Sequence, residues 1–318
     1  MKLRIVDIDH LMIRVAELDG AVEQFRRLGF VVAPPRCNRE DHAVPVRPYD
    51  NRFILFQPYP GRRDVANFLA LACLKDQFGA PWELRKRMSF LWDTVGPRTI
   101  VCLADDLQRS YEEMLAAGWE VDLSPPPPDD VGWWDQAAER WLPLRNRPCS
   151  PTYRQLPFMF NTYYTDTLES FQYEPWTRHP NTARYLSMIT GVTDDIRRDA
   201  EIMSVQVFGS TPEWLSDDIV IVPCRDLALR IVTPRGFESL YPGLDYSSER
   251  VLPSLCAATI VVEDAVEAAA VLHANGVTYA TPGDGRVLVP RVQASNTVIE
   301  FTTADRLVSK LTNTKENR

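Results

Sequence analysis

The stretch Asp7-Ile8-Asp9-His10-Leu11-Met12-Ile13-Arg14-Val15 decides the fold, together with residues 16–30, which follow it directly. It is a short run rich in apolar and β-branched residues, which is typical of a strand, and it carries one histidine. Apolar residues then recur at helical spacing up to Gly29, where a left-handed cap would end a helix. Residues 30–33 are predicted to form a second strand. The unit is therefore strand, helix, strand, with a histidine on its first strand.

The same order of elements recurs along the chain, and such repeats define the architecture. Residues 100–104 lead into a helical segment that ends at Gly118, and residues 259–262 lead into another that ends at Gly276. A looser copy runs over residues 185–209 and needs a longer helix. Aligning the glycines that end the helices predicts four βαβββ modules in an α+β protein.

The segments between these units complete the predicted layout. Strands are expected at 51–57, 64–75, 156–164, 168–176, 218–223, 227–233, 287–290 and 296–301, a connecting helix at 78–88, an aromatic insertion at 133–141 and a turn at 236–245. The prolines at 125–128 exclude a helix or a central strand there. We predict one domain over 1–178 with modules one and two, a second over 179–305 with modules three and four, and a polar tail over 306–318.

Composition narrows the class of partner. The net charge of −8 over 318 residues, without a compensating Lys/Arg block, argues against nucleic acid. No signal peptide or membrane-length apolar run is visible, and six cysteines without a CxxC pair are typical of a reducing compartment. We expect a cytoplasmic monomer or homodimer that acts on a small molecule. No dinucleotide fingerprint or P-loop is found, so no nucleotide cofactor is expected.

Four segments resemble the vicinal oxygen chelate superfamily, and within it the glyoxalase-like domain proteins. They are residues 8–15 with 21–29, Asn51-Arg52, His179-Pro180-Asn181, and Val298-Ile299-Glu300-Phe301. The resemblance covers most of the chain and is strongest at both ends. It implies βαβββ modules that pair edge to edge, each pair curving into a cup-shaped mixed sheet.

The resemblance also implies a divalent metal in the cup for those members that bind one, held by a His on a first strand and a Glu on a last strand. Such ligands leave coordination positions open for two substrate oxygens, and the metal acts as a Lewis acid. For this chain the implied metal is Fe, Mn, Zn, Ni or Mg. The implied ligands are His10, His179 and Glu300, with His10 and Glu300 also as catalytic residues.

The sequence departs from this pattern at most of the ligand positions. Thr99, Ser187 and Ala257 stand near the place that His10 holds, and Ala70 stands where module one would carry its carboxylate. Only Glu300 keeps the terminal carboxylate. If modules one and four pair, His10 and Glu300 share one cup.

Each predicted ligand also has a structural interpretation. His10 could be a satisfied core histidine, Glu300 a buried ion-pair partner, and His179 the organiser of a turn. The predicted substrate-binding residues are Asn51, Arg52, Trp133 and Tyr163, and their aromatic members could equally belong to the core.

Three functions follow from these observations. The first is a metal-dependent lyase or isomerase acting on a small organic substrate with adjacent oxygens (carbonyl, enol or hydroxyl), in secondary metabolism or catabolism. The second is a metal-free cup of the same fold that binds a small molecule or uses acid/base groups alone. The third is a ring-cleaving dioxygenase, which Ser187 and Ala257 disfavour because histidines are expected there.

Overall fold

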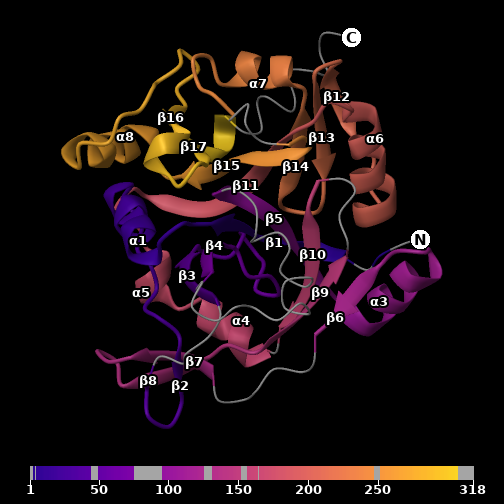
Figure 1. Cartoon of the computed structure of the whole chain (residues 1–318). Helices are drawn as coiled ribbons and strands as arrows, with labels where there is room; N and C mark the ends of the chain where they lie inside the picture. The colour runs from indigo at the N-terminus through magenta and orange to yellow at the C-terminus, as the bar shows by residue number, and fades with distance from the viewer. Residues whose placement is uncertain are drawn as a thin grey trace.

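The computed structural model describes residues 3, 5–43, 49–74, 95–124, 131–151, 156–163, 165–246 and 251–306. Their strands form two seven-stranded sheets and one three-stranded sheet. Figure 1 shows the two large sheets lying one above the other, with helices at the sides and at both far ends. The fold is mixed α+β, as predicted.

The first sheet is built from the amino-terminal half of the chain in the order β3-β4-β1-β5-β10-β9-β6. Its strands are β1 (Ile5–Arg14), β3 (Tyr49–Leu55), β4 (Phe68–Leu74), β5 (Gly96–Ala104), β6 (Val121–Leu123), β9 (Asn146–Pro151) and β10 (Phe158–Tyr163). Strand β1 pairs antiparallel with β5 and parallel with β4, and β5 pairs parallel with β10. Modules one and two therefore join through their first strands.

The second sheet repeats this pattern in the order β12-β13-β14-β11-β15-β17-β16. Its strands are β11 (Ala183–Val192), β12 (Glu213–Ser216), β13 (Ile219–Pro223), β14 (Ala228–Val232), β15 (Ser254–Val262), β16 (Val287–Val289) and β17 (Val298–Thr302). Strand β11 pairs antiparallel with β15 and parallel with β14, and β15 pairs parallel with β17. Modules three and four therefore join as modules one and two do.

The helices and the small sheet surround these two sheets. They are α1 (Leu18–Arg27), α3 (Leu107–Ala116), α4 (Thr165–Phe171), α5 (Glu174–Thr177), α6 (Ile196–Glu201), which continues as a π-helix (Ile202–Phe208), α7 (Pro234–Leu240), α8 (Ala265–Ala274) and a 3-10 turn (Arg291–Gln293), with the strands β2 (Cys37–Asn38), β7 (Val131–Asp135) and β8 (Arg140–Pro143). In three modules an aspartate side chain, from Asp106, Asp195 or Asp264, caps the first turn of the helix. None of the helices formed by the described residues is long and apolar enough to cross a membrane.

Three sequence-based assignments are wrong. Residues 168–176 fall in α4, α5 and the short link between them instead of a strand, and Leu168 and Phe171, three positions apart, pack into the same apolar cluster. Helix α7 replaces the turn expected at 236–245, since Thr233 caps Gly236 and Pro234 begins the helix. Residues 30–33 make no strand. The expectations for residues 78–88, 125–128 and 307–318 lie outside the described residues.

One apolar core joins the two large sheets. It contains Ile8, Leu11 and Ile13 of β1 together with Leu186 and Ile189 of β11. Because side chains alternate along a strand, the neighbouring residues of both strands point to the opposite sides, which we call the outer faces. Helix α4 and the small sheet cover the outer face of the first sheet, and α7 covers that of the second (Figure 1).

Polar contacts also tie the two halves together. The buried Asp7 carboxylate accepts a hydrogen bond from the backbone N of Asp226 at 2.9 Å. Asn181 donates to the carbonyl of Leu28 at 2.9 Å, directly before Gly29. A Cβ added to Gly29 (φ +85°) would lie 2.7 Å from Val271 and 2.8 Å from Asn181. The helix-ending glycine of module one therefore lies in close contact with the carboxyl-terminal half.

This contact makes Gly29 more sensitive to substitution than the equivalent Gly118. Gly118 has φ +79° and nothing within 4 Å of an added Cβ, so Gly118→Ala should cost only the left-handed penalty of about 1 kcal/mol. Gly29→Ala should lose a further ~1–3 kcal/mol from overpacking. Urea unfolding of both variants measures the difference, and equal losses would contradict this packing.

Candidate functional site

The repeated strand pattern allows positions on the two outer faces to be compared. His10 and Met188 occupy the same place, because each pairs with corresponding residues of the two flanking strands. Met159 on β10 and Glu300 on β17 likewise occupy the same place beside the central strand. The first outer face thus carries a histidine without the carboxylate, and the second carries the carboxylate without the histidine.

His10 is held in place by its neighbour Asp9. Its Nδ1 is hydrogen-bonded to the Asp9 carboxylate, at a point where the pairing of β1 and β5 is irregular. The imidazole stacks on the ring of Phe68 with 4.0 Å between centroids. Because a carboxylate oxygen accepts, Nδ1 is the donor in this contact and Nε2 is the nitrogen that remains for a substrate. In the described part of the chain no hydrogen bond reaches Nε2, so the ring is arranged as a base.

Asp9 has one oxygen left over. The residue is fully buried, and its Oδ2 has no hydrogen bond of good geometry from a described residue, although the Tyr163 side chain interacts with the same carboxylate. Tyr163 lies nearby: burial, followed by the charge of Asp9, raises the pKa of the Tyr163 phenol well above its usual value. Asn161 donates to that phenol oxygen at 3.0 Å. Since an unsatisfied buried carboxylate oxygen is costly, this corner of the outer face suits a polar ligand.

The structure places the other predicted substrate-binding residues around this corner or behind it. Asn51 lies on the outer face, 7% exposed, and its buried Oδ1 has no partner among the described residues. Arg52 instead donates to Asp50 at 3.2 Å and to the carbonyl of Asn51. Trp133 is fully buried and packs edge-on against Phe53, so it belongs to the aromatic cover of this face.

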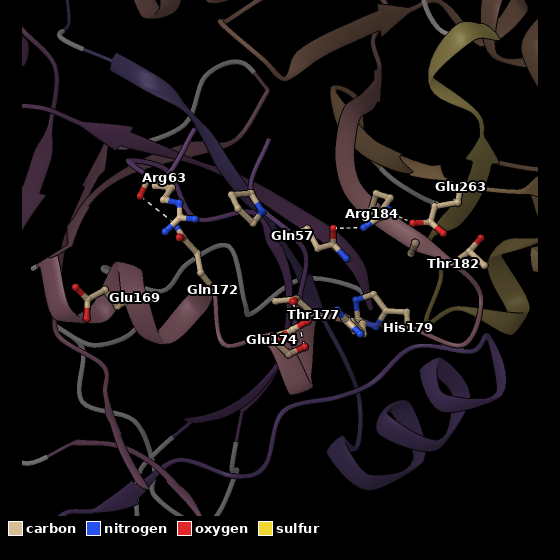
Figure 2. A pocket seen from close by; sticks show the side chains of 13 residues that line it. Gln57, Arg63, Glu169, Gln172, Glu174, Thr177, His179, Thr182, Arg184 and Glu263 are labelled. Atoms are coloured by element: carbon tan, nitrogen blue, oxygen red, sulfur yellow. Dashed lines mark hydrogen bonds and ion pairs between the residues drawn. The ribbon is translucent and has the colours of Figure 1, made fainter. Parts of the chain in front are cut away.

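His179 has a structural role in the fold. Its Nδ1 accepts from the backbone N of Val31 at 3.0 Å, and its Nε2 donates to the carbonyl of Leu55 at 2.9 Å. Burial lowers the pKa of His179 to about 4, so the ring is neutral at pH 7. The ring borders an open polar cavity of about 790 Å³, whose rim includes Arg184 paired with Glu263 (Figure 2). Both ring nitrogens are already used, which leaves none for a metal.

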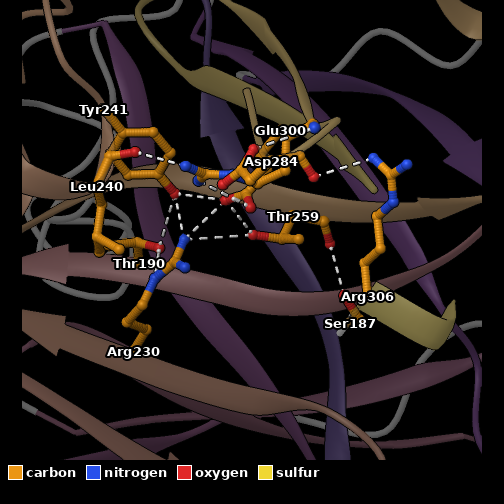
Figure 3. A network of polar contacts seen from close by, with 10 residues as sticks. Ser187, Thr190, Arg230, Leu240, Tyr241, Thr259, Asp284, Glu300 and Arg306 are labelled. Carbon is orange, nitrogen blue, oxygen red and sulfur yellow. Dashed lines mark hydrogen bonds and ion pairs between the residues drawn. The ribbon is translucent and has the colours of Figure 1, made fainter. Parts of the chain in front are cut away.

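Glu300 is enclosed by hydrogen-bond donors (Figure 3). Its Oε2 accepts from Arg230 at 2.8 Å, Tyr241 at 2.9 Å and Thr259 at 3.0 Å, and its Oε1 accepts from Arg286 at 3.2 Å. Burial opposes ionisation, but the two guanidinium groups outweigh it and lower the pKa of Glu300 to about 2. Two arginines therefore supply the positive charge beside this carboxylate.

The expected metal site of His10, His179 and Glu300 is not formed. His10 and Glu300 lie on different sheets, on faces directed away from each other, because β1 pairs with β5 and not with module four. No three His, Cys, Asp or Glu side chains among the described residues are grouped to hold a metal ion. The shared cup inferred for modules one and four is thus corrected, and Glu300 is not placed with His10 as a catalytic partner.

Sequence reasoning missed the arginines that pair with Glu300. Arg230 stands alone among apolar residues in β14, and a lone charge in a buried strand normally needs a partner. That signal could have paired Arg230 with Glu300, which also stands alone among apolar residues in its strand, β17. Arg286 and Tyr241 had no such signal, because both lie outside strands.

Comparison with known proteins agrees with the fold. A family model described as a glyoxalase-like domain matches residues 8–205. No curated protein matches the sequence.

Solved structures of similar fold include three differently named proteins. A hypothetical protein from Staphylococcus aureus has TM-score 0.57 and 8% identity, covering 93% of this chain and 98% of that one. The Mn(II)-bound glyoxalase from Novosphingobium aromaticivorans has TM-score 0.53 and 12% identity, covering 95% and 83%. The 2,3-dioxygenase LapB from Pseudomonas sp. KL28 has TM-score 0.54 and 11% identity, covering 96% and 94%. At these identities the likeness concerns the fold alone.

The buried neutral state of His179 predicts a pH dependence of stability. Its pKa is about 4 in the fold and 6.5 when unfolded, so the contribution of His179 to stability is constant above pH 6.5 and falls as pH drops toward 4. At pH 5 the loss should be about 2 kcal/mol. His179→Gln does not titrate and can make similar hydrogen bonds, so it should lack this part of the decline in urea unfolding. An identical pH dependence of the unfolding free energy in both proteins would contradict the burial of a neutral His179.

Removing the charge of Glu300 should be strongly destabilising. Glu300→Gln leaves two buried guanidinium groups without a counter-charge, which should cost about 3–5 kcal/mol in unfolding free energy. The exposed Glu213→Gln, on edge strand β12, is the matched control and should cost little. A loss as small as that of the control would mean that the network contributes nothing.

Proposed function

Because this chain belongs to the glyoxalase-like domain family, we propose that it is an isomerase or lyase that moves a proton on a small substrate with adjacent oxygens. The observation that carries the proposal is the buried Asp9–His10 hydrogen bond, with Nε2 of His10 left without a partner among the described residues. A base whose second nitrogen is held by a carboxylate is a recurring arrangement for proton abstraction.

In this proposal Nε2 of His10 removes the proton from the carbon beside the substrate carbonyl. The Asp9 carboxylate stabilises the imidazolium that forms, through the hydrogen bond to Nδ1. Tyr163 stays protonated at neutral pH because burial and the Asp9 carboxylate raise its pKa, and in this proposal its single proton turns from Asp9 to the developing oxyanion. Asn161 holds that phenol, and Asn51 offers a further polar group on the same face.

The described residues around His10 do not fit a divalent metal. The positions that pair with it or lie beside it on the outer face are Phe68, Val101 and Met159, none of which is a ligand for a hard cation. The Asp9 carboxylate, which is next to His10, already holds the imidazole. The proposed mechanism therefore has no step through a metal, unlike the first function expected from the sequence.

Solvent deuterium exchange tests the proposal without knowledge of the full reaction. A panel of 2-hydroxy ketones, 2-oxo acids and hydrated 1,2-dicarbonyls in D₂O, followed by proton NMR, reports proton removal beside a carbonyl. The wild type should exchange at least one of them, and His10→Gln should lower kcat by about 10²–10⁴. His42→Gln is the control, because that exposed ring only stacks on Trp134.

Asp9→Asn tests the role of the Asp9 carboxylate while leaving the His10 ring in place. It should lower kcat, because the amide no longer stabilises the imidazolium that forms when His10 takes the proton. Exchange that persists in His10→Gln, or no exchange by the wild type with any panel member, would contradict the proposal. If EDTA abolished exchange by the wild type and Mn²⁺ restored it, the reaction would depend on a metal and the metal-free mechanism would be wrong.

A further inference from the structure

The outer face of the first sheet carries a second polar position besides His10. Arg14 lies at the end of β1 on the same face, because the pairing with β4 runs without a break from His10 opposite Phe68 to Arg14 opposite Ala72. Along a strand, His10 and Arg14 are about 13 Å apart. Asn51 of β3 also pairs with Ala72, so Arg14 and Asn51 flank one alanine across three neighbouring strands.

Both side chains have buried polar atoms that no described residue satisfies. Arg14 is half-buried, and its Nε is wholly buried without a hydrogen-bond partner; its guanidinium forms no ion pair with the described part of the chain. Asn51 is 7% exposed, and its buried Oδ1 likewise has no partner among the described residues. A buried guanidinium nitrogen requires an acceptor, and a negatively charged acceptor also balances its charge.

The second sheet shows that the fold does not require polar residues at these positions. The row of the second sheet with the same strand pairing is wholly apolar and consists of Ile219, Val232 and Val192. All three pack in one apolar cluster with Phe237 of α7. Arg14 and Asn51 therefore bring buried polar atoms to positions that apolar residues fill elsewhere in the same molecule, and such departures are typical of ligand sites.

The described residues between these two polar positions carry no charge. The row that separates the row of His10 from the row of Arg14 contains Ala70, Met12 and Thr99. Because Ala70 and Ala72 have only methyl side chains, short groups separate the imidazole from the guanidinium on this face. A ligand that lies along β1 would contact the base at one end, the guanidinium at the other and uncharged side chains between them.

We propose that Arg14 and Asn51 bind a carboxylate of the substrate, at the end remote from the carbonyl on which His10 acts. This inference rests on the proposed function and narrows its substrates to small oxo acids with a short uncharged chain between carbonyl and carboxylate. Arg14 donates to the carboxylate through Nε, and the Asn51 amide turns to donate through Nδ2, which breaks no hydrogen bond to a described residue. One guanidinium balances the single charge of a carboxylate and only part of the charge of a phosphate.

Binding of levulinate, its two longer homologues and the amide of each tests this site separately from turnover. Isothermal titration of the full chain at pH 7 should show saturable binding of at least one acid, with its amide bound about tenfold more weakly or worse. Arg14→Met keeps the length of the side chain without its charge, so it should weaken the acid by a similar factor and leave the amide unchanged. Arg26→Met, on the exposed side of α1, is the matched control and should change neither.

Two further measurements exclude a merely structural role. Asn51→Asp should also weaken binding of the acid, because it places a like charge beside the carboxylate. The urea midpoint of Arg14→Met should not fall below that of the wild type, since apolar residues fill the corresponding row of the second sheet. A lower midpoint would make Arg14 a structural residue and overturn the proposal.

The carboxylate site and the proposed reaction fail separately. Equal affinity of the wild type for acid and amide, or no saturable binding of any acid in the millimolar range, would overturn the carboxylate site. His10→Gln should still bind the acid, because Arg14 and Asn51 are intact. Binding that depends on Arg14, without deuterium exchange by the wild type, would support the carboxylate site and contradict only the reaction. Exchange of neutral ketones as efficient as that of oxo acids would support the reaction and overturn only the carboxylate site.

Discussion

The apolar core between the two sheets constrains every other feature of this protein. Ile8, Leu11 and Ile13 on one side and Leu186 and Ile189 on the other must face each other to be buried. The alternation of side chains then directs the remaining residues of β1 and β11 outward, in opposite directions. Two separate polar faces are the consequence, and no side chain on one can reach the other.

The buried polar groups on the two outer faces are hydrogen-bonded in different ways. On the second sheet the Glu300 carboxylate is paired with Arg230 and Arg286, so it stays ionised and both of its oxygens accept hydrogen bonds. On the first sheet Asp9 and His10 balance each other only in part, because one carboxylate oxygen and one ring nitrogen have no hydrogen bond of good geometry with the described residues. The Asp9–His10 pair has atoms left to contact a substrate, whereas the hydrogen-bonded Glu300 network stabilises the fold. For this reason we propose that the reaction takes place on the first sheet.

Much of the fold could be predicted from the sequence because it rests on local signals. The strand around His10, the glycine that ends each module helix and the repeat itself are short-range patterns. The pairing of β1 with β5 could not be predicted, since it joins residues about ninety positions apart and depends on which apolar faces meet. The predicted sharing of a cup by His10 and Glu300 failed for that reason. Helix α7 was missed although Thr233-Pro234 is a recognisable start signal.

The most direct test of the central claim is the protonation of the His10 ring, read by ¹⁵N NMR at pH 8 with His10→Gln for assignment. Our account predicts a protonated Nδ1, held by Asp9, and an unprotonated Nε2, the same atom that must accept a proton. His179 provides an internal reference, because its contacts require the opposite tautomer. A His10 ring protonated at Nε2 and bare at Nδ1 would contradict the account, since no base would then face the substrate.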